Sequence, residues 1–179
     1  MSPPAQPAWP TLRGMATAFC PPLEIVGEEP ARLEVRLRDP NGVDDVRLRY
    51  RSERGLFLRT YFLVFEAEIQ GAGPQQPGEL VLRRRRLTWR RPKPQNAVQW
   101  QRRLGTPALD GLLRRLQVER LALTWQPARS SWRLELETLS GSLTVTFFPP
   151  LSTPNPLRRA EAEACLGLVQ EIRRGLQGR

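Results

Sequence analysis

The chain has 179 residues but no histidine, and its only lysine is Lys93. Without imidazole it has no Ser-His-Asp or Cys-His nucleophilic site, and it lacks the side chain that most often performs general acid–base catalysis. The two cysteines, Cys20 and Cys165, are too few to fill a tetrahedral zinc shell or to staple a chain of this length. We therefore predict a binding or accessory protein rather than an enzyme, with no cofactor and no metal site.

Motifs for nucleotides and membranes are missing too. The sequence contains no P-loop and no G-x-G-x-x-G fingerprint, and Gly71-Ala72-Gly73 lacks the strand-to-helix context that a phosphate-binding loop needs. No apolar stretch approaches the roughly 20 residues that span a bilayer. The first residues lack the basic and apolar regions of a signal peptide. These features predict a cytoplasmic location and no transmembrane segment.

Positive charge is abundant, with 28 basic residues against 18 acidic ones and a net charge of +10. Arginine suits bidentate recognition of phosphate and carboxylate groups, but a GC-rich genome also encodes most positive charge as arginine. We attribute the preference for arginine over lysine mainly to the genome. The shortage of acids needs a separate explanation.

That shortage is concentrated in residues 80–109, which hold nine basic residues and no Asp or Glu. The other 149 residues carry a net charge of only +1. The predicted polyanion-binding residues are the nine cations of this segment and one tryptophan among them: Arg83, Arg84, Arg85, Arg86, Arg90, Arg91, Lys93, Arg102, Arg103 and Trp100.

Two period-2 runs, 32–38 and 45–51, flank the turn cluster Asp39-Pro40-Asn41-Gly42 and predict a β-hairpin. Charge selects its register. Pairing Glu34 with Arg49 and Arg38 with Asp45 places opposite charges together, whereas a two-residue slip places arginines opposite arginines.

Residues 57–69 are apolar on both faces, which predicts a central strand. Residues 80–89 predict a further strand, in which the alternation of apolar and polar residues is interrupted at the arginines. Residues 91–105 resemble an irregular connection. A helix capped by Thr106, three strands and a helix capped by Asn155 follow. We predict an α+β fold in the order ββββ-α-βββ-α, with a mostly antiparallel sheet of about seven strands and two helices on one face or end. Residues 1–20 are predicted to form a proline-rich arm, and residues 21–179 a single domain.

Three interpretations of the basic segment remain open. It could bind a polyanion such as nucleic acid, with Trp100 stacking on a base and Trp89 in the core. It could instead dock on an acidic protein, as a scaffold or assembly factor does, or be merely solvated. Peripheral contact with an anionic membrane is a lesser form of the first interpretation. The pairs Glu66/Glu68 and Glu135/Glu137 are interpreted as the solvent-facing side of two strands rather than as catalytic carboxylates.

Overall fold

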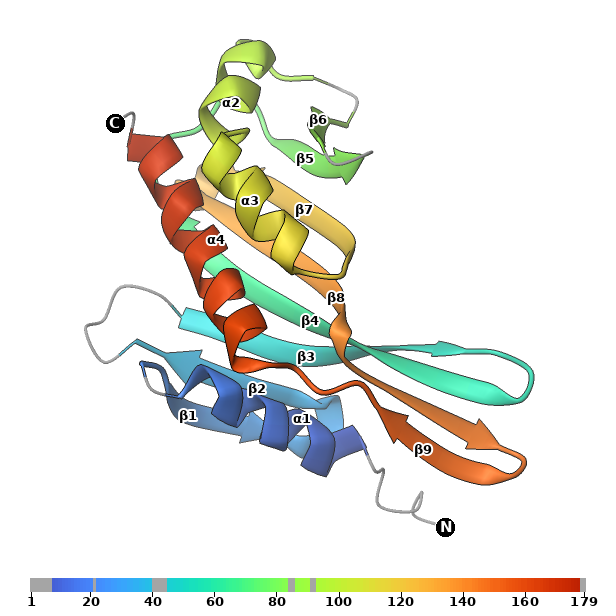
Figure 1. Ribbon diagram of the computed structural model, residues 1–179. Coiled ribbons are helices and arrows are strands. Elements are labelled where there is room, and N and C mark those ends of the chain that lie inside the picture. Colours follow the sequence, from blue (N-terminus) through green and yellow to red (C-terminus); the bar gives the residue numbers. More distant parts are fainter. Residues whose placement is uncertain (1–7, 21, 40–44, 84–85, 91–92, 178–179) are drawn as a thin grey trace.

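The computed structural model describes residues 8–20, 22–39, 45–83, 86–90 and 93–177. Within them, one antiparallel sheet of nine strands is combined with four α-helices (Figure 1). The strands are β1 (Glu24–Glu29), β2 (Glu34–Arg38), β3 (Asp45–Arg54), β4 (Leu58–Gln70), β5 (Gly78–Arg83), β6 (Arg86–Trp89), β7 (Val118–Gln126), β8 (Ser131–Phe147) and β9 (Pro150–Pro154). The helices are α1 (Ala8–Ala16), α2 (Ala97–Leu104), α3 (Pro107–Arg115) and α4 (Arg159–Gln177).

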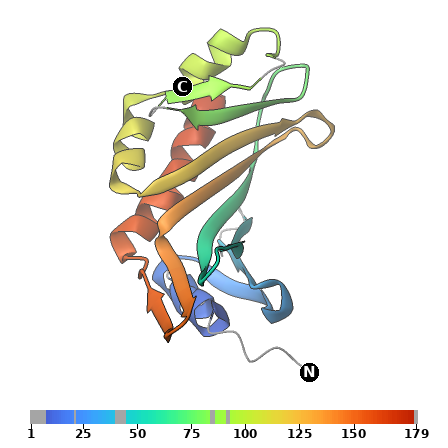
Figure 2. The same ribbon diagram turned by 90° about the vertical axis from the view of Figure 1, so that its right-hand side faces the viewer.

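The strands lie in the order β1-β2-β3-β4-β8-β7-β5-β6, and β9 pairs with the far end of β8. The helices α1, α3 and α4 pack against one face of this sheet, which we call the helical face, and we call the other the open face (Figures 1 and 2). The mixed α+β class and the antiparallel sheet were correctly predicted. The expected seven strands and two helices were too few. No helix of the described residues is long and apolar enough to cross a bilayer.

Strand alternation explains why one face is the core. Leu37, Leu48 and Phe65 have the parity that points to the helical face, and they share one buried cluster with Leu12 of α1 and Ile172 of α4. Toward the β5–β6 end the cluster is aromatic. Trp132 is fully buried, and the rings of Trp89, Trp100 and Trp125 surround it at centroid distances of 5.4–6.1 Å.

The charge-selected hairpin register is confirmed. Glu34 pairs with Arg49, and Arg38 pairs with Asp45 across β2 and β3. The Nε atom of Arg38 lies 3.1 Å from Oδ1 of Asp45. Charge patterning predicted this alignment, although Glu34 forms its ion pair with Arg47, at 3.1 Å, Arg49 binds Glu66, and Arg36 lies opposite Arg47.

The predicted proline-rich arm is wrong for the described residues of 1–20. Residues 8–16 form α1, which buries Ala8, Leu12, Met15 and Ala16 against the sheet. Phe19, just beyond the helix, stacks on Phe65 of β4 with 5.7 Å between the ring centroids. The buried apolar residues at helical spacing outweigh the prolines, because a proline in the first turn of a helix removes no intrahelical hydrogen bond. Residues 1–7 lie outside the described part of the chain.

The basic segment also folds differently from the prediction. Residues 78–89 form two strands rather than one, and Leu82 lies directly opposite Leu87. Both leucines can therefore face the core although five residues separate them, which explains the phase break. Residues 97–104, expected to be irregular, form α2, which is held to β6 by a 2.6 Å hydrogen bond from Trp89 Nε1 to the Ala97 carbonyl oxygen.

The two predicted helix caps have different outcomes. Thr106 caps α3, since its Oγ1 accepts a 3.1 Å hydrogen bond from the Leu109 amide. Asn155 does not cap α4, because its backbone and side chain bond to residues of β8, including a 2.8 Å bond from Nδ2 to the Leu139 carbonyl. The helix α4 begins at Arg159, where the Glu161 carboxylate accepts a bond from the Arg158 amide.

The strand β8 contains a bulge between Thr138 and Leu143. Leu63 lies opposite Thr138, whereas Tyr61 lies opposite Leu143, so extra residues of β8 loop out between these pairs. Gly141 in this bulge has a φ of +85°. Its carbonyl accepts a 2.9 Å bond from the hydroxyl of Tyr50, whose pKa is raised by burial, so that the hydroxyl stays protonated and can donate.

Replacing Gly141 with alanine should lower the free energy of unfolding by about 2–4 kcal/mol. The left-handed φ disfavours any Cβ, and a Cβ here would lie 2.5 Å from Cδ2 of Leu63. Urea denaturation should show this loss for Gly141→Ala. The control Gly111→Ala, at a helical site with no heavy atom within 4 Å of the new Cβ, should not destabilise the protein. Equal stability of the two variants would contradict the strain at Gly141.

Candidate functional site

The open face carries a network of arginine–carboxylate ion pairs. The residues Glu66 and Glu137 are both only 6 % exposed, although no helix covers them. Arg49 and Arg133 both bind Glu66, and Arg51 binds both carboxylate oxygens of Glu137, with 2.8 Å from Nε to Oε2. The hydrogen bonds to Glu137 and Glu53 raise the pKa of Arg51. The sequence predicted that these glutamates face solvent. Glu66 and Glu137 do lie on the face away from the helices, but they are buried beneath guanidinium groups rather than in water.

Arginine also resolves a conflict between like charges. Glu66 of β4 lies directly opposite Glu135 of β8, an arrangement that destabilises a sheet by itself. One guanidinium nitrogen of Arg133 lies 3.0 Å from Glu66 and 2.9 Å from Glu135 and so bridges them. The arginines of this face therefore stabilise the sheet by pairing with its buried carboxylates.

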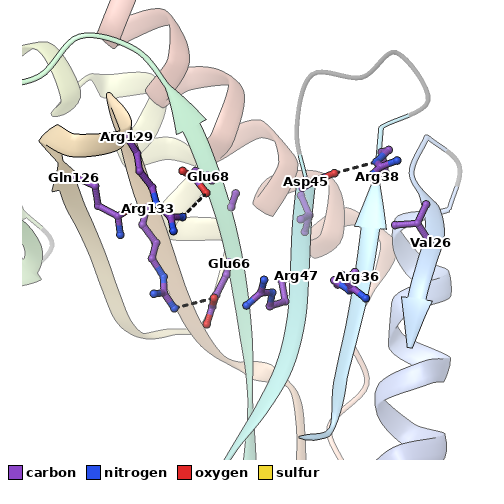
Figure 3. A pocket seen from close by; sticks show the side chains of 12 residues that line it. Val26, Arg36, Arg38, Asp45, Arg47, Glu66, Glu68, Gln126, Arg129 and Arg133 are labelled. Carbon is purple, nitrogen blue, oxygen red and sulfur yellow. Dashed lines mark hydrogen bonds and ion pairs between the residues drawn. The ribbon is translucent and has the colours of Figure 1, made fainter. Parts of the chain in front are cut away.

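A hollow of about 370 Å³ opens on this face, and Figure 3 shows its lining side chains. Five arginines and three carboxylates contribute to it: Arg36, Arg38, Arg47, Arg129, Arg133, Asp45, Glu66 and Glu68. Each of the five guanidinium groups has a carboxylate partner within 4.0 Å. Alternation of charge along the strands placed Arg36, Arg38 and Arg47 on the polar face. Nothing in the sequence indicated that Arg129 and Arg133, from β7–β8, would join them.

The predicted basic segment lies at the opposite end of the molecule from α1, β1 and β2 (Figure 1). Arg83 and Arg86 face each other across the β5–β6 hairpin, and β6 is the last strand of the sheet. Arg102 and Arg103 belong to α2, which packs beside β6. The predicted residues Arg84, Arg85 and Arg91 lie outside the described part of the chain.

The cations of this segment differ from those of the open face in their partners. Arg90 pairs with Glu79 at 2.9 Å. Within the described residues, Arg83, Arg86, Lys93 and Arg102 have no carboxylate within ion-pairing distance, and Arg103 lies over the Trp100 ring at 5.1 Å. We call Arg83, Arg86, Lys93, Arg102 and Arg103 the basic edge.

Two members of the basic edge share a second hollow. Arg86 of β6 and Arg102 of α2 both line a cavity of about 460 Å³, together with Leu87, Val98, Gln101, Gly105 and Asp110. The hairpin and the helix thus bring together two guanidinium groups from separate elements of the chain, beside a single carboxylate.

Trp100 was included among the predicted binding residues as a stacking platform, and its burial argues against that role. Its side chain is only 8 % exposed and packs against Trp132. Trp89, predicted to belong to the core, is 7 % exposed. The rings of both tryptophans are thus used in folding, and the basic edge offers cations only.

The described residues contain no cluster of three potential metal ligands. The thiol of Cys165 is fully buried in the core, and burial raises its pKa to about 12. Burial also raises the pKa of Cys20. A protonated thiol is a poor nucleophile, so neither cysteine resembles an activated catalytic residue.

The structure is thus an α+β domain with two groups of arginines. Those of the open face form ion pairs with carboxylates, and those of the basic edge form none within the described residues. Residues 20–176 match the family described as DUF3156, protein of unknown function, and the chain belongs to this family. No curated protein and no solved structure matches the chain.

The ion pairs of the open face should differ sharply in their contribution to stability. Replacing Arg51 with methionine leaves the buried Glu137 uncompensated and should cost about 3 kcal/mol. Replacing Arg38, whose pair with Asp45 is exposed on both sides, should cost less than about 1 kcal/mol. Chemical denaturation of Arg51→Met and Arg38→Met makes the comparison. The double variant Arg51→Met/Glu137→Met should recover most of the loss, and a double variant less stable than Arg51→Met would contradict this interpretation.

Proposed function

We propose that this protein is a non-enzymatic accessory protein that binds a polyanion, nucleic acid in the first instance, through the basic edge. The observation that carries the proposal is the contrast in pairing. Arginines of the open face are held by carboxylates, whereas Arg83, Arg86, Lys93 and Arg102 have no such partner among the described residues. Unpaired guanidinium groups are the ones free to accept external phosphates.

The energetics favour the basic edge over the open face. A phosphate bound at Arg51 or Arg133 would compete with the buried carboxylates of Glu137 and Glu66, and losing such a partner is costly. A phosphate bound at Arg86 or Arg102 displaces only water and counterions, and counterion release drives binding to polyanions. The open-face hollow is therefore the less favourable anion site despite its five arginines.

The same geometry limits the specificity of binding. The tryptophans of the segment are buried, so base stacking by Trp89 or Trp100 is not part of the proposal. Cations that contact only the phosphate backbone carry no direct sequence information. We expect binding that depends weakly on sequence and strongly on salt.

A second candidate is docking on an acidic protein, as an assembly factor does. The hollow shared by Arg86 and Arg102 also contains Leu87 and the exposed Val98, and β6 lies at the sheet edge. An acidic extended segment could add to β6 by backbone hydrogen bonds and place its carboxylates at these arginines. This candidate uses the same residues but a different ligand.

Reversing two charges of the basic edge tests the proposal. At about 50 mM salt, the variant Arg86→Glu/Arg102→Glu should bind a fluorescent single-stranded oligonucleotide with an affinity at least about tenfold lower than that of the unmodified protein. The slope of log affinity against log salt concentration should become shallower by about 0.7 for each arginine. Fluorescence anisotropy at several salt concentrations measures both quantities.

The matched control is Arg32→Glu/Arg158→Glu, which changes net charge equally at exposed sites away from the basic edge. It should keep most of the affinity. An equal loss in both variants, or no binding by the unmodified protein, would refute nucleic-acid binding at this edge. If a polyglutamate peptide binds instead, and only Arg86→Glu/Arg102→Glu abolishes that binding, the acidic-protein candidate is favoured.

A further inference from the structure

An exposed apolar group lies far from the basic edge, at the ends of two hairpins. Phe57 is 66 % exposed, Leu56 85 % and Phe148 87 %. With three neighbours they form what we call the apolar tip: Leu56, Phe57, Leu58, Phe147, Phe148 and Leu151. Six large exposed apolar residues in one place are unusual, since isolated ones are the norm on protein surfaces.

The two hairpins meet through the backbone. The Phe147 amide donates a 2.9 Å hydrogen bond to the Phe57 carbonyl oxygen. Leu58 lies opposite Thr146 on one side, and Leu151 lies opposite the same threonine on the other. The β3–β4 and β8–β9 hairpins project together from the body of the molecule (Figure 1). The apolar tip is therefore one continuous feature.

This tip is apolar on both faces of the sheet. Leu58 and Leu151 flank Thr146 in register and so share its face, whereas Phe147, the next residue, points to the opposite face. Leu56 and Phe148 lie in the turns at the ends. A protein partner docked on one face would leave the other face in water, but an apolar medium that surrounds the tip would cover both.

The two segments that form the tip carry charge of one sign, and the nearest acid along β3, Glu53, is bound by Arg51 at 2.6 Å. Residues 54–60 and 143–155 contain no Asp or Glu, and their two charged residues are Arg54 and Arg59. These arginines lie opposite each other at the base of the β3–β4 turn, and neither has a carboxylate partner within the described residues. The tip thus combines an apolar end with an uncompensated positive collar.

We propose that the apolar tip inserts into the surface of an anionic lipid bilayer. Phe57, Phe148 and their neighbours would enter the boundary between headgroups and acyl chains, and Arg54 and Arg59 would remain at the level of the anionic headgroups. The inference concerns a different surface and a different ligand from the basic edge, and it does not depend on the proposed function.

The collar also argues against the obvious alternative occupant, a second copy of this chain. A symmetric tip-to-tip contact brings together two copies of the same positive collar, and the two tip segments contain no acidic residue to pair with it. Such like-charge contacts oppose association, whereas anionic headgroups complement the collar.

Flotation with vesicles tests the proposal. The full chain should float with vesicles of phosphatidylcholine that contain phosphatidylserine as the minor, anionic component. The variant Phe57→Ser/Phe148→Ser should bind them at least about tenfold more weakly, because two large exposed side chains no longer enter the apolar layer. Arg54→Gln/Arg59→Gln should lose the preference for the anionic vesicles over pure phosphatidylcholine. Both variants change exposed or half-exposed side chains, and circular dichroism verifies their fold.

Two controls separate the alternatives. Val98→Ser alters an equally exposed apolar residue on α2 and should leave vesicle binding unchanged. Arg86→Glu/Arg102→Glu should also keep it. The proposal is overturned if the chain does not float, or if the basic-edge variant alone abolishes flotation. It is also overturned if Phe57→Ser/Phe148→Ser leaves flotation intact, or if light scattering shows that this variant merely dissociates a dimer and no vesicle binding occurs.

Discussion

A buried carboxylate needs a cation, and the open face of this sheet is organised by that requirement. The helices cover only one face, so the strands must shield the other with their own side chains. Arg49 and Arg133 cover Glu66, and Arg51 covers Glu137, so that glutamates outside the helical core are as buried as core leucines. Because a lone buried charge is expensive, each of these arginines is tied to its position.

This requirement sorts the arginines into two groups. Those of the open face complete the fold and are only weakly available to an external anion. Those of the basic edge lie in a segment with no acidic residue, and within the described residues the acids that border it, Glu79 and Asp110, form no ion pair with them. Arginine abundance alone says little about function here. The informative quantity is the number of arginines that the fold leaves without a partner.

Local patterns of the sequence predicted local structure well. Alternating charges predicted the β2–β3 register, and Thr106 marked the start of α3. The helix α1 was not predicted because of the prolines near the N-terminus. The β5–β6 hairpin was not predicted because the apolar alternation is interrupted between Leu82 and Leu87. Asn155 had the right neighbours for a helix cap, but β8 uses its hydrogen bonds.

Long-range pairing explains most of what the sequence could not show at the candidate site. Arg51 reaches Glu137 across 86 residues, and Arg133 reaches Glu66 across 67. No local pattern predicts such partners, because they depend on β8 lying beside β4. The acid-free segment was visible in the sequence, but whether its cations were paired depended on the fold. Trp100 was misjudged for the same reason, since its burial comes from Trp132 on the distant strand β8.

The central claim is that the unpaired arginines of the basic edge bind the polyanion and the paired arginines of the open face do not. A titration of the ¹⁵N-labelled protein with a short single-stranded oligonucleotide, followed through the Nε–Hε resonances of arginine, tests it most directly. The account predicts that the signals of Arg83, Arg86 and Arg102 shift while those of Arg49, Arg51 and Arg133 stay in place. Shifts concentrated on Arg49, Arg51 and Arg133, or spread evenly over all arginines, would contradict it.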